Sequence, residues 1–213
     1  MPVMKSAKRW SKKYSNHAML QEIKTGAEKK LPSQNPRLPQ KPLGMTEIAY
    51  ISIGSNLNNP QQQVITAVTE LNEVLNTKVA AVSHWYRTSP MGPQDQPDYI
   101  NGVAKLETKL SPEQLLKALQ TIEDGHFRER KEHWGARTLD LDILLYGNQT
   151  IDLPNLQIPH PGITTRNFVL LPLADINPQL VLPDGTALAT LLESCSSKGI
   201  VRLSSGDICG TTG

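Results

Sequence analysis

The 213-residue sequence lacks the features of several broad protein classes. No apolar run approaches the roughly 18 residues of a membrane-spanning helix, and no apolar signal-peptide segment follows the basic N-terminus. Its two cysteines, Cys195 and Cys209, form no CxxC pattern and have no histidine nearby. This spacing argues against a metal site and against a disulfide framework. We therefore expect a cytoplasmic protein with two incidental thiols.

Two common phosphate-binding motifs are also missing. Neither GxxxxGK[ST] nor GxGxxG occurs, which excludes the P-loop and the Rossmann fold as ways to hold phosphate groups. Aromatic residues make up only 5% of the chain, and the aromatic signature of RNP-type RNA-binding modules is absent. Any bound phosphate must therefore be held by metal ions and side chains.

The net charge of +2 conceals two segments of opposite charge. Ten of the 22 basic residues and two of the 20 acidic ones precede residue 45, which gives residues 1–44 a charge of +8. The other 12 basic and 18 acidic residues give residues 45–213 a charge of −6. The basic character of the whole chain therefore says nothing about the ligands of its acidic part.

Composition also suggests domain boundaries. Residues 31–44 contain four prolines and no apolar period, as is typical of an extended linker. We predict that residues 1–44 form a disordered basic extension with this linker, that residues 45–195 form the folded domain, and that residues 196–213 form a flexible tail. A nucleic-acid anchor, a membrane-surface anchor and a transit peptide are alternative interpretations of the basic segment, and Met45 could be a second start.

Apolar periodicity and turn residues predict the order of structural elements. Strands are expected at residues 47–54, 79–88, 99–108 and 137–147, and helices are expected to begin at Pro60 and Pro112. Asn59 and Ser111 stand at the N-cap positions, and Ser111 forms a capping box with Gln114. A short helix over residues 168–175, a strand at residues 180–183 and a last helix capped by Thr186 follow.

The resulting order is β-α-β-β-α-β with a small C-terminal α/β extension. It predicts an α+β fold with a ferredoxin-like core and a three-layer αβα arrangement. Because the same layout serves RNA-binding modules as well as enzymes, the fold alone does not name a function.

Two aspartates interrupt the apolar strand RTLDLDILLYG at residues 137–147. Alternation places Asp140 and Asp142 on one face of that strand, together with Leu144 and Tyr146. The two aspartates are separated by two strand rises, about 6.5 to 7 Å, so both carboxylates can lean toward one point. Two partly buried anions require a compensating cation. Two solvated residues on an exposed sheet face are the alternative interpretation.

A basic segment leads directly into this strand. Its cationic residues are Arg128, Arg130, Lys131, His133 and Arg137. Arginine suits bidentate phosphate contacts, and carboxylates that bridge two Mg²⁺ ions stabilise charge in phosphoryl transfer. A second candidate cluster contains Tyr99 and Asn101, which share one strand face and suit a planar heterocycle.

The longest motifs resemble one enzyme family. They are GSN at residues 54–56, YRT at 86–88, GPQDQPDYIN at 92–101, HWGARTLDLDILLYG at 133–147 and IPHPGITTRNFVLLPL at 158–173. This pattern is similar to that of the 6-hydroxymethyl-7,8-dihydropterin pyrophosphokinases of folate biosynthesis, and it covers about residues 46–195. The resemblance implies transfer of pyrophosphate from ATP to the pterin hydroxymethyl group with release of AMP, using two Mg²⁺ ions and ATP as co-substrate.

The resemblance also assigns roles to residues. Asp140 and Asp142 match the metal-bridging pair, and Arg128 and Arg137 match arginines that act on the phosphates. Residues matched to substrate binding are Asn56, Thr88, Ser89, Met91, Tyr99, Asn101, Trp134 and Phe168, of which Trp134 belongs to the nucleotide side or its support. Residues matched to the nucleotide side or its support are Gln120, Glu123, Arg130, His133, Ile143, His160 and Arg166.

The sequence departs from the family pattern at two positions near the nucleotide. His133 stands where an arginine is common, and Pro161 stands where an aromatic residue can follow the histidine. We expect a monomeric enzyme that acts on small molecules, without a membrane or nucleic-acid partner. The alternatives are a noncatalytic RNA-binding module, which the acidic core opposes, and a related enzyme that acts on another heterocyclic alcohol.

Overall fold

The computed structural model describes residues 45–92, 95–126 and 136–204. The elements of this part of the chain are, in order, β1 (Glu47–Ser55), α1 (Pro60–Glu73), β2 (Thr77–Val82), β3 (Tyr86–Thr88), β4 (Tyr99–Thr108), α2 (Pro112–Gly125), β5 (Asp140–Tyr146), β6 (Ile151–Leu153), β7 (Leu156–Ile158), α3 (Asn167–Ile176), α4 (Leu188–Glu193) and β8 (Ile200–Arg202). The fold is therefore of the mixed α and β kind that the sequence predicts.

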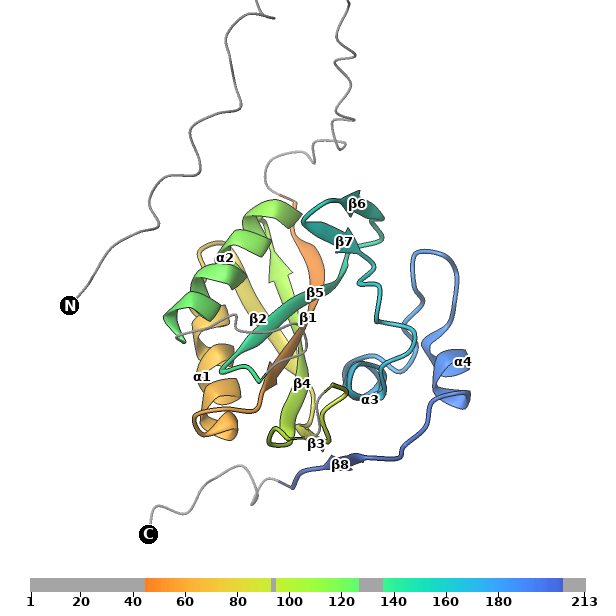
Figure 1. Ribbon diagram of the computed structural model, residues 1–213. Coiled ribbons are helices and arrows are strands. Elements are labelled where there is room, and N and C mark those ends of the chain that lie inside the picture. Colours follow the sequence, from red (N-terminus) through yellow and green to blue (C-terminus); the bar gives the residue numbers. More distant parts are fainter. Residues whose placement is uncertain (1–44, 93–94, 127–135, 205–213) are drawn as a thin grey trace, which may run out of the picture. The chain divides into compact units, whose positions relative to one another are not determined.

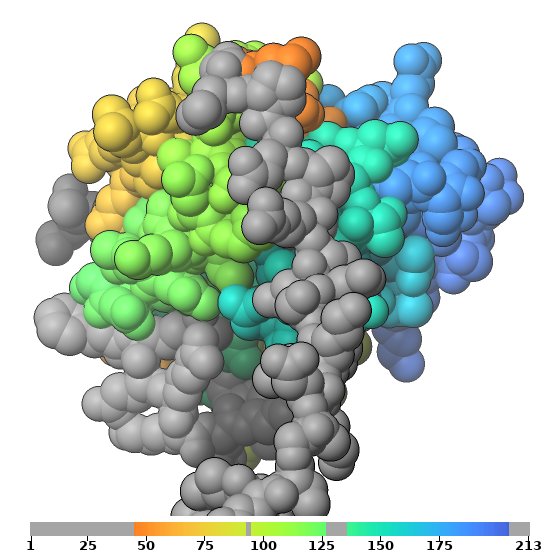
Figure 2. All heavy atoms as spheres, turned by 90° about the horizontal axis from the view of Figure 1, so that it is seen from above, coloured from red at the N-terminus to blue at the C-terminus, as the bar shows by residue number. Residues whose placement is uncertain are grey.

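An antiparallel sheet forms the centre of this fold (Figure 1). Its strand order is β5-β1-β4-β3-β8, and β2 pairs with β4 beside β3. Helix α1 packs on β1, β2 and β4, and α2 packs on β5. Helix α3 packs on β3 and β4 from the other side, and α4 packs on α3. Figure 2 shows the same separation from above, with the yellow and green segments on one side and the blue C-terminal segments on the other.

The two N-terminal helices begin in different ways. Ser111 forms the expected capping box of α2: its hydroxyl accepts from the backbone N–H of Gln114 at 3.3 Å, and its own N–H donates to Gln114 Oε1 at 2.8 Å. Asn59 precedes Pro60 as expected but makes no capping hydrogen bond with its side chain. Its φ of 61° is left-handed, whereas a capping side chain normally requires an extended backbone.

The predicted strand at residues 79–88 is divided into β2 and β3. Ser83 lies between them, and its hydroxyl accepts from the backbone N–H of Val103 at 2.9 Å. Trp85, also between them, is buried against Gly102, where a Cβ would lie 2.6 Å from the indole ring. The chain therefore bends around a buried tryptophan instead of continuing as one strand.

Strand β5 contains a bulge that strict alternation does not predict. Ile143 pairs with Ile51 and Leu145 pairs with Tyr50, which leaves Leu144 as an extra residue. Leu144 and Leu145 therefore both enter the apolar cluster that contains the buried residues of α3. The prediction that Tyr146 shares a strand face with Asp140 and Asp142 is therefore wrong, because the additional residue reverses the alternation beyond it.

The C-terminal region differs from the sequence prediction in three places. The strand expected at residues 180–183 is reduced to one bridge between Val181 and Ala187. Ala187, not Thr186, is the N-cap of α4. The flexible tail predicted from residue 196 is wrong for residues 200–202, which form β8 and pair with β3. The burial of Leu203 explains this order, since its N–H also donates to the carbonyl of Trp85 at 2.8 Å.

Two smaller observations complete the fold. The short hairpin of β6 and β7 was not expected from the sequence. Within the described ranges, no helix has both the length and the apolar character needed to cross a membrane.

Candidate active site

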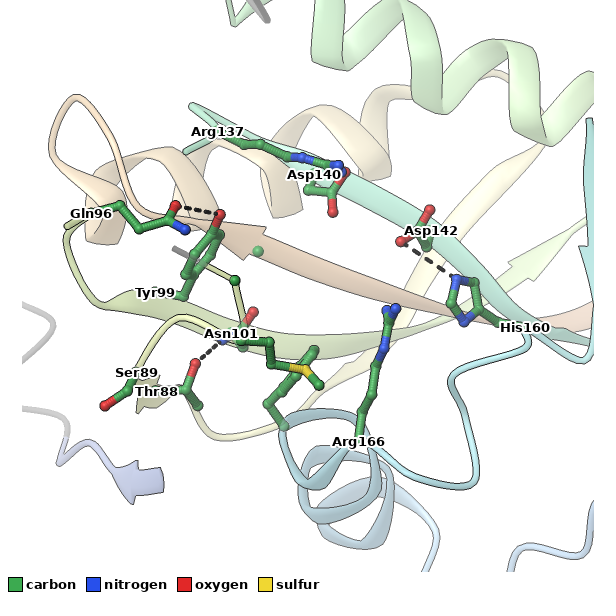
Figure 3. A pocket seen from close by; sticks show the side chains of 14 residues that line it. Thr88, Ser89, Gln96, Tyr99, Asn101, Arg137, Asp140, Asp142, His160 and Arg166 are labelled. Atoms are coloured by element: carbon green, nitrogen blue, oxygen red, sulfur yellow. Dashed lines mark hydrogen bonds and ion pairs between the residues drawn. The ribbon is translucent and has the colours of Figure 1, made fainter. Parts of the chain in front are cut away.

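A pocket of about 300 Å³ lies on the α3 side of the sheet, which is within the size range of small-molecule sites (Figure 3). Strands β1, β3, β4 and β5, helix α3 and the loops beside them supply its walls. The lining residues are Gly54, Thr88, Ser89, Met91, Gly92, Gln96, Tyr99, Asn101, Arg137, Asp140, Asp142, His160, Arg166 and Phe168. Segments more than 100 residues apart in the sequence thus meet at one cavity.

The two aspartates of β5 border this pocket as alternation predicts. Asp140 pairs with Gly54 of β1, and Asp142 pairs with Ser52. Gly54 leaves space for the side chain of Asn101, because a Cβ there would approach Asn101 Oδ1 to 2.9 Å. Figure 3 shows both carboxylates on the cavity side of the strand. The first half of the strand therefore presents two negative charges to one cavity.

An arginine compensates the first aspartate. Arg137 Nη1 donates to Asp140 Oδ1 at 2.5 Å, within the turn that leads into β5. Burial lowers the pKa of Arg137, but Asp140, together with Asp142 and Tyr99, raises it overall. The guanidinium therefore stays charged and supplies the cation that the acidic pair requires.

The second aspartate is compensated less well. Burial raises the pKa of Asp142 to about 7, and Asp140 and Glu123 add to this shift. The side chain keeps 41% of its surface accessible because it borders the cavity, yet protein surrounds it on the other sides. His160 Nε2 lies 3.8 Å from Asp142 Oδ2. Burial and Arg166 lower the pKa of His160, which favours the neutral imidazole over a full positive charge.

The acidic pair fits a magnesium site completed by phosphate oxygens. Among the described residues, no group of three or more His, Cys, Asp or Glu side chains could hold a metal ion by itself. Mg²⁺ is usually bound through one or two carboxylates together with substrate phosphates. The electrostatic strain on Asp142 is what a divalent cation would relieve.

The opposite wall of the pocket combines polar and aromatic side chains. Asn101 Nδ2 donates to Thr88 Oγ1 at 2.7 Å, and both residues are buried. The Tyr99 hydroxyl donates to Gln96 Oε1 at 3.3 Å (Figure 3). The fixed amide and the aromatic ring suit a flat molecule with hydrogen-bonding edges.

Helix α3 and its N-cap residue contribute one aromatic ring and one cation to the same pocket. Its Phe168 lies under the guanidinium of Arg166, whose Cζ is 5.8 Å from the ring centroid. Figure 3 shows the Arg166 side chain extending from α3 toward the aspartate strand. A phosphate chain between Arg137 and Arg166 would therefore meet positive charge on two sides.

Comparisons with known proteins assign the chain to a family. The sequence model for 7,8-dihydro-6-hydroxymethylpterin-pyrophosphokinase (HPPK) matches residues 50–178. The chain belongs to the HPPK family. As a member, it is a pyrophosphokinase, and the alternative of a noncatalytic RNA-binding module has no support.

Individual HPPK relatives match over nearly their full length. The 2-amino-4-hydroxy-6-hydroxymethyldihydropteridine pyrophosphokinase of Pseudomonas aeruginosa is 49% identical over 159 residues, which are 75% of this chain and 98% of that protein. The protein of the same name from Haemophilus influenzae is 46% identical over 155 residues, which are 73% of this chain and 97% of that protein.

Solved structures support the fold of an HPPK protein. The wild-type HPPK-DHPS of Plasmodium falciparum with pteroate superposes with a TM-score of 0.56 and 16% identity, over 70% of this chain. The chain spans 42% of that structure's length. Because the identity is low, this likeness concerns only the fold.

The pocket contains most of the HPPK site residues expected from the sequence. Those that line it are Thr88, Ser89, Met91, Tyr99, Asn101, Arg137, Asp140, Asp142, His160, Arg166 and Phe168. Arg128, Arg130, His133 and Trp134 lie outside the described residues. Gly54, Gly92 and Gln96 also line the pocket but were not assigned a role from the sequence. All three stand within the GSN and GPQDQPDYIN motifs, so these motifs are the sequence signal that could have identified them.

Asn56 lies behind the pocket wall and does not line the cavity formed by the described residues. It is 1% exposed. Its side chain donates to Gln96 Oε1 at 3.1 Å and to the carbonyl of Pro97 at 3.0 Å, and it accepts from the backbone N–H of Arg137 at 2.7 Å. These contacts make Asn56 a connector between two loops of the site.

Three residues expected on the nucleotide side also lie away from the lining of this cavity. Glu123 is 3% exposed and accepts from the backbone N–H of Leu141 at 2.8 Å. Ile143 is buried in β5, and Gln120 is exposed on α2. Among the described residues, these three therefore do not line the pocket that the acidic pair borders.

Proposed function

We propose that this protein transfers the β,γ-pyrophosphoryl group of ATP to the hydroxymethyl oxygen of 6-hydroxymethyl-7,8-dihydropterin, within folate biosynthesis. The observation that carries this proposal is the acidic pair Asp140 and Asp142, which faces a cavity whose opposite wall contains Tyr99 and Asn101. Membership of the HPPK family supports the same reaction.

The reaction is a displacement at the β-phosphorus of ATP. The pterin hydroxymethyl oxygen forms a bond to this phosphorus, and the bond from the phosphorus to the oxygen shared with the α-phosphate breaks. AMP leaves with that oxygen, and the hydroxyl proton is released. Such a step is accelerated mainly by positioning and by charges that meet the phosphate oxygens.

The residues of this chain have separate tasks in that step. Asp140 and Asp142 would hold two Mg²⁺ ions, which would supply positive charge to neutralise the phosphates. Arg137 and Arg166 stand on two sides of the cavity and would contact the phosphates. We assign Arg128, Arg130, His133 and Trp134 to the same substrate complex.

The polar and aromatic wall would bind the pterin. Asn101, held by Thr88, offers its amide to the hydrogen-bonding edge of the ring system. Tyr99 and Phe168 offer aromatic surfaces at the same cavity. Asn56 would act through Gln96. Gln120, Glu123, Ile143 and His160 would support the nucleotide side, as the family resemblance implies.

We also propose finer assignments for the whole chain. The strand order β5-β1-β4-β2, with α1 and α2 on one face, is consistent with a ferredoxin-like core in a three-layer αβα arrangement. The protein would act as a cytoplasmic monomer, with residues 1–44 as an extension that takes no part in the reaction.

One assay tests the proposed reaction. The full chain is incubated with ATP, Mg²⁺ and the reduced pterin, and the nucleotide products are separated. Formation of AMP in equal amount to the pterin diphosphate is expected. Formation of ADP, or the absence of any pterin-dependent product, would contradict the proposal.

A further inference from the structure

A buried histidine links the end of helix α2 to helix α1, two helices that lie side by side in Figure 1. His126 directly follows α2 and is 8% exposed. Its Nδ1 lies 2.5 Å from Gln63 Oε1, and its Nε2 lies 2.6 Å from Glu70 Oε2. His126 is not among the residues that line the pocket, and the reaction proposed above does not use it.

A second hydrogen bond determines the orientation of the Gln63 amide. Gln63 Nε2 donates to the carbonyl oxygen of Asn58 at 2.8 Å. The amide oxygen must therefore face His126 and accept from it, since an amide nitrogen would not serve as the acceptor. The carboxylate of Glu70 can also only accept. Both ring nitrogens of His126 thus face side-chain oxygens, with Gln63 Oε1 at Nδ1 and Glu70 Oε2 at Nε2.

The loop held by Gln63 has an unfavourable backbone conformation. Asn58 and Asn59 have φ values of 52° and 61°, so two consecutive residues other than glycine are left-handed. This conformation costs free energy, although asparagine tolerates it better than most residues. Besides the side-chain bond to Asn58, the backbone N–H of Gln63 donates to the carbonyl of Asn59 at 3.1 Å. Gln63 therefore restrains both strained residues.

The same loop contacts two walls of the pocket through Asn56. Asn56 accepts from the backbone N–H of Arg137, and its own N–H donates to the carbonyl of Arg137 at 3.0 Å. Its side chain also donates to Gln96, which accepts from the Tyr99 hydroxyl. A displacement of residues 56–59 would therefore move the backbone of Arg137 and the support of Tyr99 together.

We propose that His126 is a positioning residue for this active site. Its Nδ1–H fixes the Gln63 amide, Gln63 holds the strained loop at residues 56–59, and Asn56 in that loop holds Arg137 beside Asp140. The kinetic part of this inference rests on the proposed function, whereas the restraint of the loop does not.

Two substitutions separate this role from a simple link between helices. In His126→Asn the side-chain nitrogen replaces Nδ1 and keeps a donor for Gln63, whereas in His126→Gln it replaces Nε2 and keeps a donor for Glu70. We expect His126→Asn to retain turnover within about threefold, and His126→Gln to lower kcat/KM for the pterin by at least about tenfold. If His126→Gln keeps turnover and His126→Asn loses it, the Glu70 contact is the important one and the proposal is overturned. Equal loss in both variants, or no loss in either, would also overturn it.

The loop can be followed without any enzyme assay. Hydrogen exchange at the amide of Asn56, which donates to Arg137, reports the order of residues 56–59. We expect exchange to accelerate by about tenfold in His126→Gln and to stay near the wild-type rate in His126→Asn. An inactive wild-type chain would contradict the proposed function, whereas unchanged exchange in His126→Gln would overturn the role of His126 alone.

Matched variants on α1 complete the experiment. Gln63→Ala should reproduce the defect of His126→Gln, and combining the two should add little, because both remove the same connection. Gln62→Ala is the control, since this exposed neighbour donates to Thr66 on its own helix. Additive losses in the double variant, or a defect in the control as large as in Gln63→Ala, would overturn the proposal.

Discussion

Glu123 of α2 accepts a 2.8 Å hydrogen bond from the backbone N–H of Leu141, one residue after the first aspartate of β5. Strand β5 stands at one end of the sheet order, so this N–H points away from its strand partner β1. Both groups are buried, and an unpaired buried N–H is costly. The helix thus fixes the strand that carries the acidic pair.

Removal of this acceptor should destabilise the protein. We expect Glu123→Ala to lower the free energy of unfolding by about 1 to 3 kcal/mol, which corresponds to about 2 to 4 °C in Tm for each kcal/mol. Glu123→Gln keeps a carbonyl oxygen and should stay closer to the wild type. Thermal unfolding followed by circular dichroism measures both variants, and equal Tm values for them would show that the Leu141 contact contributes nothing.

The strain on Asp142 predicts a dependence of stability on pH. Its pKa is raised to about 7 in the folded protein, mainly by burial, so the folded state binds its proton more tightly than the unfolded state does. This contribution is fully present below about pH 4 and is lost as the pH rises through 7. Without Mg²⁺, Asp142→Asn should therefore raise Tm relative to the wild type at about pH 8, and the gain should shrink toward about pH 5. A gain in Tm that does not vary with pH would contradict this origin.

The same pair of aspartates should be indispensable for turnover. Asp140→Asn and Asp142→Asn each remove a carboxylate that faces the cavity, and each should lower kcat by at least about a thousandfold without unfolding the chain. A coupled assay for AMP, together with circular dichroism, checks both statements. Mg²⁺-dependent turnover close to the wild-type rate in either variant would rule out a two-metal site on this pair.

Local patterns in the sequence predicted the parts of the site that depend on regular elements. The alternation of β5 placed Asp140 and Asp142 together, and the alternation of β4 placed Tyr99 and Asn101 together. These residues line the pocket because a strand fixes which face a side chain occupies. The helix starts at Pro60 and Pro112 were also correct, since proline and its neighbours act locally.

Features that depend on tertiary contacts could not be predicted in this way. The extra residue Leu144 arises from the pairing of β5 with β1, and β8 is ordered by its pairing with β3. Asn56 was expected at the substrate, but its hydrogen bonds to Gln96 and Arg137 place it behind the wall. Each of these outcomes requires partners that are distant in the sequence.

The basic N-terminal segment should be dispensable for the reaction. A chain that begins at Met45 keeps every element from β1 onward, and the proline-rich linker is expected to isolate residues 1–44 from the domain. We expect its kcat to lie within about twofold of the full chain and its Tm within about 2 °C. Kinetics and calorimetry of the two chains side by side check this expectation. A large loss in either quantity would show that the extension contacts the enzyme.

Gly162 controls the position of Arg166 and provides a test of that arginine without removing it. A Cβ at Gly162 would clash with Arg166 Nε and lie 2.7 Å from its Cζ, so alanine must displace the guanidinium from its present place. The end of an arginine side chain moves easily, and Gly162 does not have a positive φ. Gly162→Ala should therefore leave Tm nearly unchanged.

The displaced arginine should nevertheless lower activity. If Arg166 contacts the phosphates from α3, Gly162→Ala should reduce kcat/KM for ATP by about tenfold, in the same direction as Arg166→Ala. Gly125→Ala is the matched control, because a Cβ at Gly125 meets nothing within 4 Å. Steady-state kinetics with ATP varied at saturating pterin makes the comparison. Wild-type kinetics in Gly162→Ala together with a defect in Arg166→Ala would mean that the arginine reaches the phosphates from a different position, whereas wild-type kinetics in both would remove Arg166 from the mechanism.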